Sequence, residues 1–194
     1  MYSYCVIILL QVCHVFGFWQ HDVMSITPQE KQLNDAIALA ADVHRNQVRK
    51  EPDGRPYICH VLDVVNAIPK DKHRERLVAA LHDTIEDVDP DKLDWLLNTI
   101  TEQFGDEVLD GVIAMTHDKK EGLNEAEELA DYLKYIEEEV LGDPAAPAVK
   151  LADNYVNMKD RVGQFIAGGP EAENARKKLH QYARSIALLT AEKR

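Results

Sequence analysis

Basic residues are scarce in this 194-residue chain, which has 22 Lys and Arg against 34 Asp and Glu and a formal net charge of −12. A surface of that sign repels the phosphate backbones of DNA and RNA, so we expect no nucleic-acid partner. The charge still allows a small phosphorylated ligand in a locally basic pocket. The length and the hydrophobic fraction of 45% indicate a globular protein with a core of ordinary size.

Cysteine is equally rare, because the chain has only Cys5, Cys13 and Cys59. An odd number argues against a disulfide framework, and the absence of a Cys-x-x-Cys pair argues against a structural zinc site. This usage is typical of a reducing compartment, and we therefore expect a cytoplasmic protein.

The apolar N-terminal segment has no basic flank, since the first Lys or Arg of the chain is Lys31. A signal peptide carries such a flank. Gln11 and His14 also interrupt a run that is already short for a membrane span. We expect residues 1–23 to be an extension outside the fold and residues 24–194 to form the domain. The alternative for the extension is a membrane anchor, although we expect no membrane partner for the domain.

Sustained alternation of polar and β-branched residues, the pattern of exposed strands, is absent from the whole sequence. Helical signals take its place, beginning with a capping box from Thr27 to Glu30 that has proline at the first helical position. The pattern predicts an all-α, single-domain helical bundle with a loop over 49–57. The expected helices cover residues 28–48, 60–69, 74–87, 90–105, 108–115, 125–141, 148–162 and 170 onward.

One expected helix combines apolar residues with the sequence His82-Asp83-Thr84-Ile85-Glu86-Asp87. Helical spacing places the imidazole and the three carboxylates on neighbouring parts of one face. Such a group is costly in an apolar setting unless a cation compensates it, and a divalent metal ion would do so. By itself a His-Asp pair is a weak signal, and the last two carboxylates also suit a solvated helix end.

Two further residues complete a candidate ligand set. His60 begins a helix and Asp153 lies in a largely apolar stretch, although each alone also suits a helix cap or an ion pair. Together with His82 and Asp83 they offer two nitrogen and two oxygen donors, which suits manganese, iron or zinc. A site with open positions activates water as a nucleophile near neutral pH.

Taken together, these residues resemble the HD-domain metal-dependent phosphohydrolases. The similarity is greatest to the hydrolase domain of RelA/SpoT-type enzymes and to the stand-alone small alarmone hydrolases, and it covers roughly residues 30–162. Five segments carry it in matching order and spacing: residues 44–50, 56–60, 79–87, 104–105 and 149–157.

The resemblance implies an HD-type helical bundle that uses manganese to remove the 3′-pyrophosphate of the stringent-response alarmone (p)ppGpp. It implies metal ligation by His60, His82, Asp83 and Asp153. It implies that Glu86 and Asp87 orient or deprotonate the attacking water. It also implies substrate contacts from Arg49, Lys50, Tyr57 and Asn157. Without the resemblance, the basic residues Arg49, Lys50 and Arg55 suit a solvated loop.

The chain departs from this family in its central segment. The sequence after Thr116 runs into the acidic stretch from Glu125 to Glu139, where the stand-alone hydrolases usually have more basic residues. No synthetase domain is present, so the expected activity is degradation only. The alternatives are an HD phosphohydrolase for another phosphorylated nucleotide or metabolite, such as NADPH, and a nucleotide-binding module without turnover. A homo-oligomer is compatible with the sequence.

Overall fold

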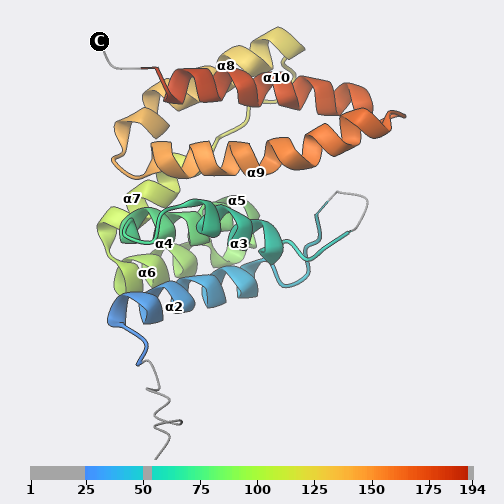
Figure 1. The fold of residues 1–194 in the computed structure, drawn as a ribbon. Helices are drawn as coiled ribbons and strands as arrows, with labels where there is room; N and C mark the ends of the chain where they lie inside the picture. Colours follow the sequence, from blue (N-terminus) through green and yellow to red (C-terminus); the bar gives the residue numbers. More distant parts are fainter. Residues whose placement is uncertain (1–24, 50–53, 192–194) are drawn as a thin grey trace, which may run out of the picture.

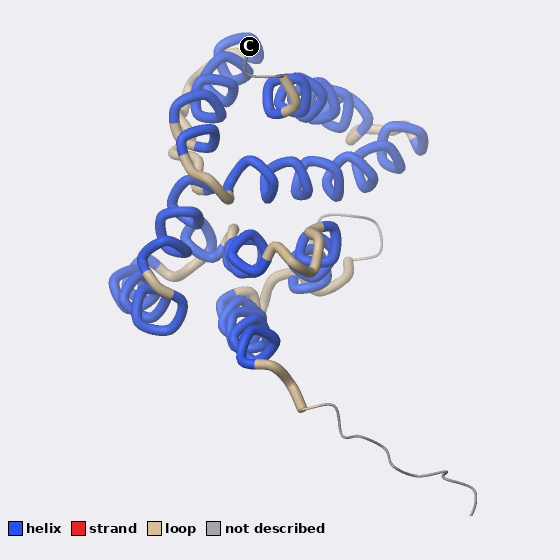
Figure 2. The backbone as a smooth tube through the Cα atoms, turned by 60° about the vertical axis from the view of Figure 1, so that its left-hand side comes forward, coloured by secondary structure: helices blue, strands red, loops and turns tan. Residues whose placement is uncertain are grey.

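The computed structural model describes residues 25–49 and 54–191. Their regular elements are helices, as Figure 2 shows, so the expected all-α fold is confirmed. The bounds are α2 Pro28–Val43, α3 Ile58–Ala67, α4 His73–Leu81, α5 Thr84–Asp87, α6 Leu93–Phe104, α7 Asp106–Met115, α8 Glu125–Glu138, α9 Ala146–Ala167 and α10 Ala172–Leu189, with 3₁₀ turns η1 Pro90–Lys92 and η2 Val140–Gly142. The extension predicted over 1–23 lies outside the described residues.

The helices form two layers, with α8, α9 and α10 above α2 to α7 in Figure 1. Helix α4 lies at the centre and packs against α2, α3, α7 and α9. Five consecutive residues of α4, from Leu77 to Leu81, are buried, which a helix permits only when neighbours cover most of its circumference. The core is therefore built around α4.

Helix α9 is the part of the upper layer that faces the lower layer. It packs along α10 above and against α3 and α4 below (Figure 1). Residues on both faces of α9 make packing contacts. The Asn154 amide donates to Ser185 of α10 at 2.8 Å, whereas Val149 and Val156 belong to the main core. The side of α9 turned toward α3 and α4 carries Asp153, which α9 thereby delivers to the lower layer.

The first helix ends at Val43, not at residue 48 as the sequence predicts. The His44 ring nitrogen Nδ1 lies 2.7 Å from Gln47 Oε1, and the chain then turns to form an isolated bridge between Val48 and Pro56. Backbone hydrogen bonds across this bridge, such as Tyr57 N–H to the Gln47 carbonyl at 3.0 Å, replace those of a continued helix.

The helix predicted over 74–87 is divided into α4 and α5. His82 Nδ1 lies 2.8 Å from the Ala79 carbonyl, and the Thr84 hydroxyl donates to the Leu81 carbonyl at 2.6 Å. These side chains occupy carbonyls that would accept backbone amides in a continuous helix. The chain turns at Asp83, which has φ −101° and ψ −2°. The other predicted helices are present, with ends displaced by a few residues.

Within the described part of the chain, no helix combines the length and the apolar character that crossing a bilayer requires.

Close packing of α4 on α7 generates a first prediction. A Cβ at Gly111 of α7 would lie 2.7 Å from Val78 Cγ2, and the β-branched Val78 cannot easily rotate away. We expect Gly111→Ala to lower the free energy of unfolding by about 1–2 kcal/mol, because overpacking outweighs the gain in helix propensity. Urea denaturation measures this change.

Gly163 of α9 is the matched control, since it is helical and exposed and a Cβ there meets no atom within 4 Å. Gly163→Ala should raise the free energy of unfolding by about 0.5–1 kcal/mol. Equal effects of the two substitutions would contradict the close packing of α4 and α7.

Candidate metal centre

Four side chains from three separate segments meet beside α4. His60 comes from α3, His82 and Asp83 from the turn between α4 and α5, and Asp153 from α9. His60 Nε2 lies 3.2 Å from Asp153 Oδ1 and 3.7 Å from Asp83 Oδ2. His82 Nε2 lies 2.9 Å from Asp83 Oδ2 and 3.8 Å from Asp153 Oδ1. The structure therefore brings together all four residues that the sequence predicts as ligands.

The His82 imidazole is fixed in an orientation that suits a metal ligand. Its Nδ1 lies 2.8 Å from the Ala79 carbonyl, a contact in which Nδ1 carries the proton and donates. Its buried Nε2 has no hydrogen-bond partner and faces the two carboxylates. Histidine ligands of metals are commonly held in this way, with one nitrogen bonded to a carbonyl and the other presenting its lone pair.

The cluster attracts positive charge. Burial alone lowers the pKa of His82, but the carboxylates of Asp83 and Asp153 outweigh burial and raise that pKa to about 9. Burial alone raises the pKa of Asp83, yet the imidazoles of His82 and His60 and the Tyr57 hydroxyl hold it well below its usual range. The carboxylates are therefore ionised and favour a positive charge beside them, which either a proton on His82 or a metal ion can supply.

The spacing of the donors fits one small ion. Two ligands at about 2.1 Å from a shared ion, separated by angles of 90–110°, lie roughly 3.0–3.5 Å apart. The four separations between histidine nitrogens and carboxylate oxygens run from 2.9 to 3.8 Å, within about 0.3 Å of that range. His60, His82 and Asp83 also form the one such compact group among the described residues. The donor set therefore fits a divalent metal ion.

Two of the predicted substrate-contacting residues hold the cluster in place. The Tyr57 hydroxyl donates to Asp83 Oδ2 at 2.6 Å, and the Asn157 amide donates to Asp153 Oδ1 at 2.5 Å. Arg49 donates to Asn157 at 2.9 Å and to Asp160 at 2.8 Å. Burial and the nearby carboxylates raise the pKa of Tyr57, so its hydroxyl keeps the proton that it donates. Lys50 lies outside the described residues.

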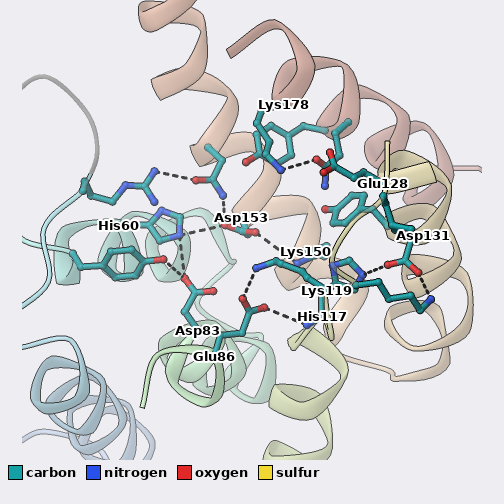
Figure 3. Close-up of a pocket in the computed structure, with 18 residues that line it drawn as sticks. His60, Asp83, Glu86, His117, Lys119, Glu128, Asp131, Lys150, Asp153 and Lys178 are labelled. Atoms are coloured by element: carbon teal, nitrogen blue, oxygen red, sulfur yellow. Dashed lines mark hydrogen bonds and ion pairs between the residues drawn. The ribbon is translucent and has the colours of Figure 1, made fainter. Parts of the chain in front are cut away.

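A cavity of about 360 Å³ opens beside the cluster, and Figure 3 shows its lining. Glu86 points into it, accepting from the Lys119 ammonium at 2.8 Å and from the His117 backbone N–H at 3.2 Å.

Asp87 does not line this cavity. Its carboxylate lies 3.4 Å from His44 Nδ1 and borders an adjoining hollow, because the turn at Asp83 changes the direction in which α5 presents it.

Part of the cavity lining comes from residues that we did not single out from the sequence. Lys150 of α9 lies under the rings of Tyr132 and Tyr135, with Nζ 5.9 and 5.3 Å from the ring centroids. Lys178 and Tyr182 reach the cavity from α10. A polar Lys150 in an apolar stretch was a usable signal, whereas nothing local marks the two residues of α10.

Comparison with known proteins identifies relatives of this chain. The guanosine-3′,5′-bis(diphosphate) 3′-pyrophosphohydrolases MESH1 of Mus musculus and Homo sapiens are 34% and 35% identical to the chain over 133 residues. Those residues are 66% of this chain and 69% of each relative. The chain belongs to the MESH1 family. No protein-family model matches the chain.

One solved structure has a fold similar to that of this chain. It is described as a metazoan ortholog of SpoT that hydrolyses ppGpp, and it matches 81% of this chain and 93% of its own length with a TM-score of 0.56. At 22% identity this likeness concerns the fold. The resemblance to HD-type and RelA/SpoT-type hydrolases that the sequence indicates is thus confirmed.

The position of Asp153 predicts that one carboxylate of α9 controls metal binding. Asp153→Asn should weaken manganese binding about a hundredfold or more, because an amide oxygen carries no charge to offset the ion. Asp94→Asn is the control, since Asp94 is an exposed carboxylate of α6. Elemental analysis after dialysis against buffered manganese measures both. Equal retention by the two variants would exclude Asp153 as a ligand.

The Tyr57 hydroxyl generates a separate prediction. Tyr57→Phe removes the hydrogen bond that orients Asp83 but leaves the four donors intact. Manganese affinity should fall about tenfold, as is usual when a partner of a metal ligand is lost. Tyr155→Phe changes an exposed tyrosine of α9 in the same way and should leave the affinity unaltered. An unchanged affinity in Tyr57→Phe would show that Asp83 needs no such support.

Proposed function

We propose that this chain hydrolyses the 3′-pyrophosphate of guanosine-3′,5′-bis(diphosphate), and that residues 24–194 form the hydrolase domain. The observation that carries the proposal is the cluster of buried His60, His82 and Asp153 with half-buried Asp83, beside a cavity that Glu86 and several lysines also line. The activity for which the MESH1 relatives are named supports the choice of substrate.

The proposed cofactor is manganese, held by the two imidazoles and the two carboxylates. This mixture of nitrogen and oxygen donors is one that manganese accepts, and iron and zinc accept it as well. A divalent ion supplies there the positive charge that polarises a phosphate and lowers the pKa of water. The protein's contribution is a preformed and buried set of donors, so little reorganisation is needed on binding.

Glu86 is the proposed general base. Its carboxylate faces the cavity and is already hydrogen-bonded on both oxygens, by Lys119 and by the His117 backbone N–H. When phosphate groups of the ligand attract Lys119, one of the Glu86 oxygens becomes available to orient and deprotonate water. Asp87 is proposed as the second catalytic carboxylate, acting from the adjoining hollow beside His44.

The anionic ligand is proposed to bind along the cationic side of the cavity. Arg49, which approaches the ring of Tyr57 at 5.6 Å, lies at one end with Asn157, and Lys119 and Lys178 lie further along. Lys50 is proposed to join Arg49. Ammonium and guanidinium groups on several walls suit a ligand with phosphates at two positions, because each phosphate requires its own cation.

A second candidate substrate is NADPH at its 2′-phosphate, or another phosphorylated nucleotide or metabolite. The observation that favours it is the acidic character of the wall formed by α8, where Glu128 and Asp131 line the cavity. A binding module without turnover is the third candidate. Glu86 argues against that module, because a carboxylate beside the predicted metal donors has a ready catalytic use.

Purified protein with manganese should release pyrophosphate and GDP from ppGpp. Glu86→Gln should lower kcat by about 10²- to 10⁴-fold while manganese binding persists, because the amide cannot accept a proton. Asp91→Asn, an exposed substitution in η1, is the control and should leave kcat unaltered. Coupled detection of pyrophosphate measures all three proteins.

An assay for inorganic phosphate with NADPH and a panel of nucleotide phosphates, run on the same proteins, separates the candidates. Release of phosphate from NADPH without turnover of ppGpp would replace the first substrate by the second. Metal-loaded protein that turns over no nucleotide and equals Glu86→Gln in every assay would favour the binding module.

A further inference from the structure

The wall of the cavity that faces the candidate metal centre carries carboxylates among its lysines. Asp131 and Glu128 of α8 line the same cavity as Lys119, Lys120 and Lys178, and Figure 3 shows the two groups interleaved. A fixed negative charge opposes the binding of a polyphosphate, so its presence in this wall must affect which anions the cavity accepts.

Asp131 is held in place by two side chains of its own chain, the cationic Lys120 and the imidazole of His117. It accepts hydrogen bonds from the Lys120 ammonium and, at 3.1 Å, from His117 Nε2. The His117 ring is in turn stacked on Tyr135, with centroids 4.6 Å apart, and meets Tyr132 edge-on. The Asp131 side chain is only 12% exposed. This carboxylate therefore cannot swing out of the cavity without leaving both partners.

These contacts reduce the cationic capacity of the cavity. Lys119 is bonded to Glu86, and Lys120, the next residue, is bonded to Asp131. Both lysines line the same cavity, so a phosphate that reached Lys120 would compete directly with Asp131. The hydrogen bond from Lys120 also lowers the pKa of Asp131, so that the carboxylate remains ionised.

We propose that Asp131 determines specificity by limiting the number of phosphate groups that the cavity accepts beyond the group that is hydrolysed. Resting on the proposed function, the inference is that Asp131 favours guanosine carrying diphosphates at both positions over the analogue with a 5′-triphosphate. The additional phosphate of that analogue would have to take Lys120 from Asp131 and tolerate its charge.

Asp131→Asn tests the proposal, because it removes the charge while keeping one oxygen that can accept from either His117 or Lys120. We expect KM for the 5′-triphosphate analogue to fall about fivefold or more, with a smaller fall for ppGpp and kcat within about twofold for both. Asp131→Glu keeps the charge and should retain the selectivity of the wild type. Glu137→Gln, which removes an exposed charge from the same helix, is the control and should change neither KM.

Two kinetic results would overturn the proposal. One is an equal change in KM for both nucleotides, and the other is a fall in kcat at constant KM, which would instead indicate that Asp131 positions Glu86 through His117. Circular dichroism and thermal unfolding establish that each variant is folded before kinetics are measured.

Calorimetric titration of the same two nucleotides separates this proposal from the proposed function. If the wild type hydrolyses neither nucleotide, the proposed function fails. Asp131→Asn should still bind the 5′-triphosphate analogue several-fold more tightly than the wild type does. Unchanged affinity, or no binding of either nucleotide to either protein, would overturn the assignment to Asp131.

Discussion

The attraction between two buried imidazoles and two ionised carboxylates is the interaction on which the rest of this structure depends. Burying such groups is expensive unless each is compensated, and here they compensate one another only in part, leaving a place for a cation. His60, His82, Asp83 and Asp153 come from α3, from the turn after α4 and from α9. Helices distant in sequence must therefore hold fixed positions around α4, and the apolar core around Leu77 to Leu81 supplies that rigidity.

The predicted metal donors and the lysine-bearing walls of the cavity lie on different parts of this fold. The predicted donors stand on or beside helices of the core, where their partners Tyr57 and Asn157 are also anchored. The opposite walls come from the connection before α8, from α8 itself and from α10. Lys119 and Lys120 of these walls are bound to carboxylates of the protein, Glu86 and Asp131. A ligand must exchange these internal ion pairs for its own, so selectivity depends on the strength of contacts that the protein already makes.

Much of this arrangement follows from the sequence. Polar residues in apolar stretches, such as His60 and Asp153, identify the cluster because water-free surroundings would not retain them without a partner. The division between α4 and α5 could not be predicted, since it depends on side-chain hydrogen bonds from His82 and Thr84 to carbonyls that compete with the helical pattern. A continuous helix would also have placed Asp87 beside Glu86. The turn between α4 and α5 instead places Asp87 in the adjoining hollow. Lys178 and Tyr182 reach the cavity only through tertiary packing of α10.

The two-sided use of α9 constrains how this chain can evolve. Asp153 faces the lower layer, whereas the next residue, Asn154, is bonded to Ser185 of α10. A single insertion or deletion upstream in the helix would rotate the residues after it by about 100° and exchange the partners of these two side chains. Length variation should therefore be purged from the segment between Lys150 and Asn157, while point substitutions accumulate on the exposed side of the helix. The connection before α8 supplies none of the four predicted donors, so a change in its length would alter the wall of the cavity and leave the donors in place.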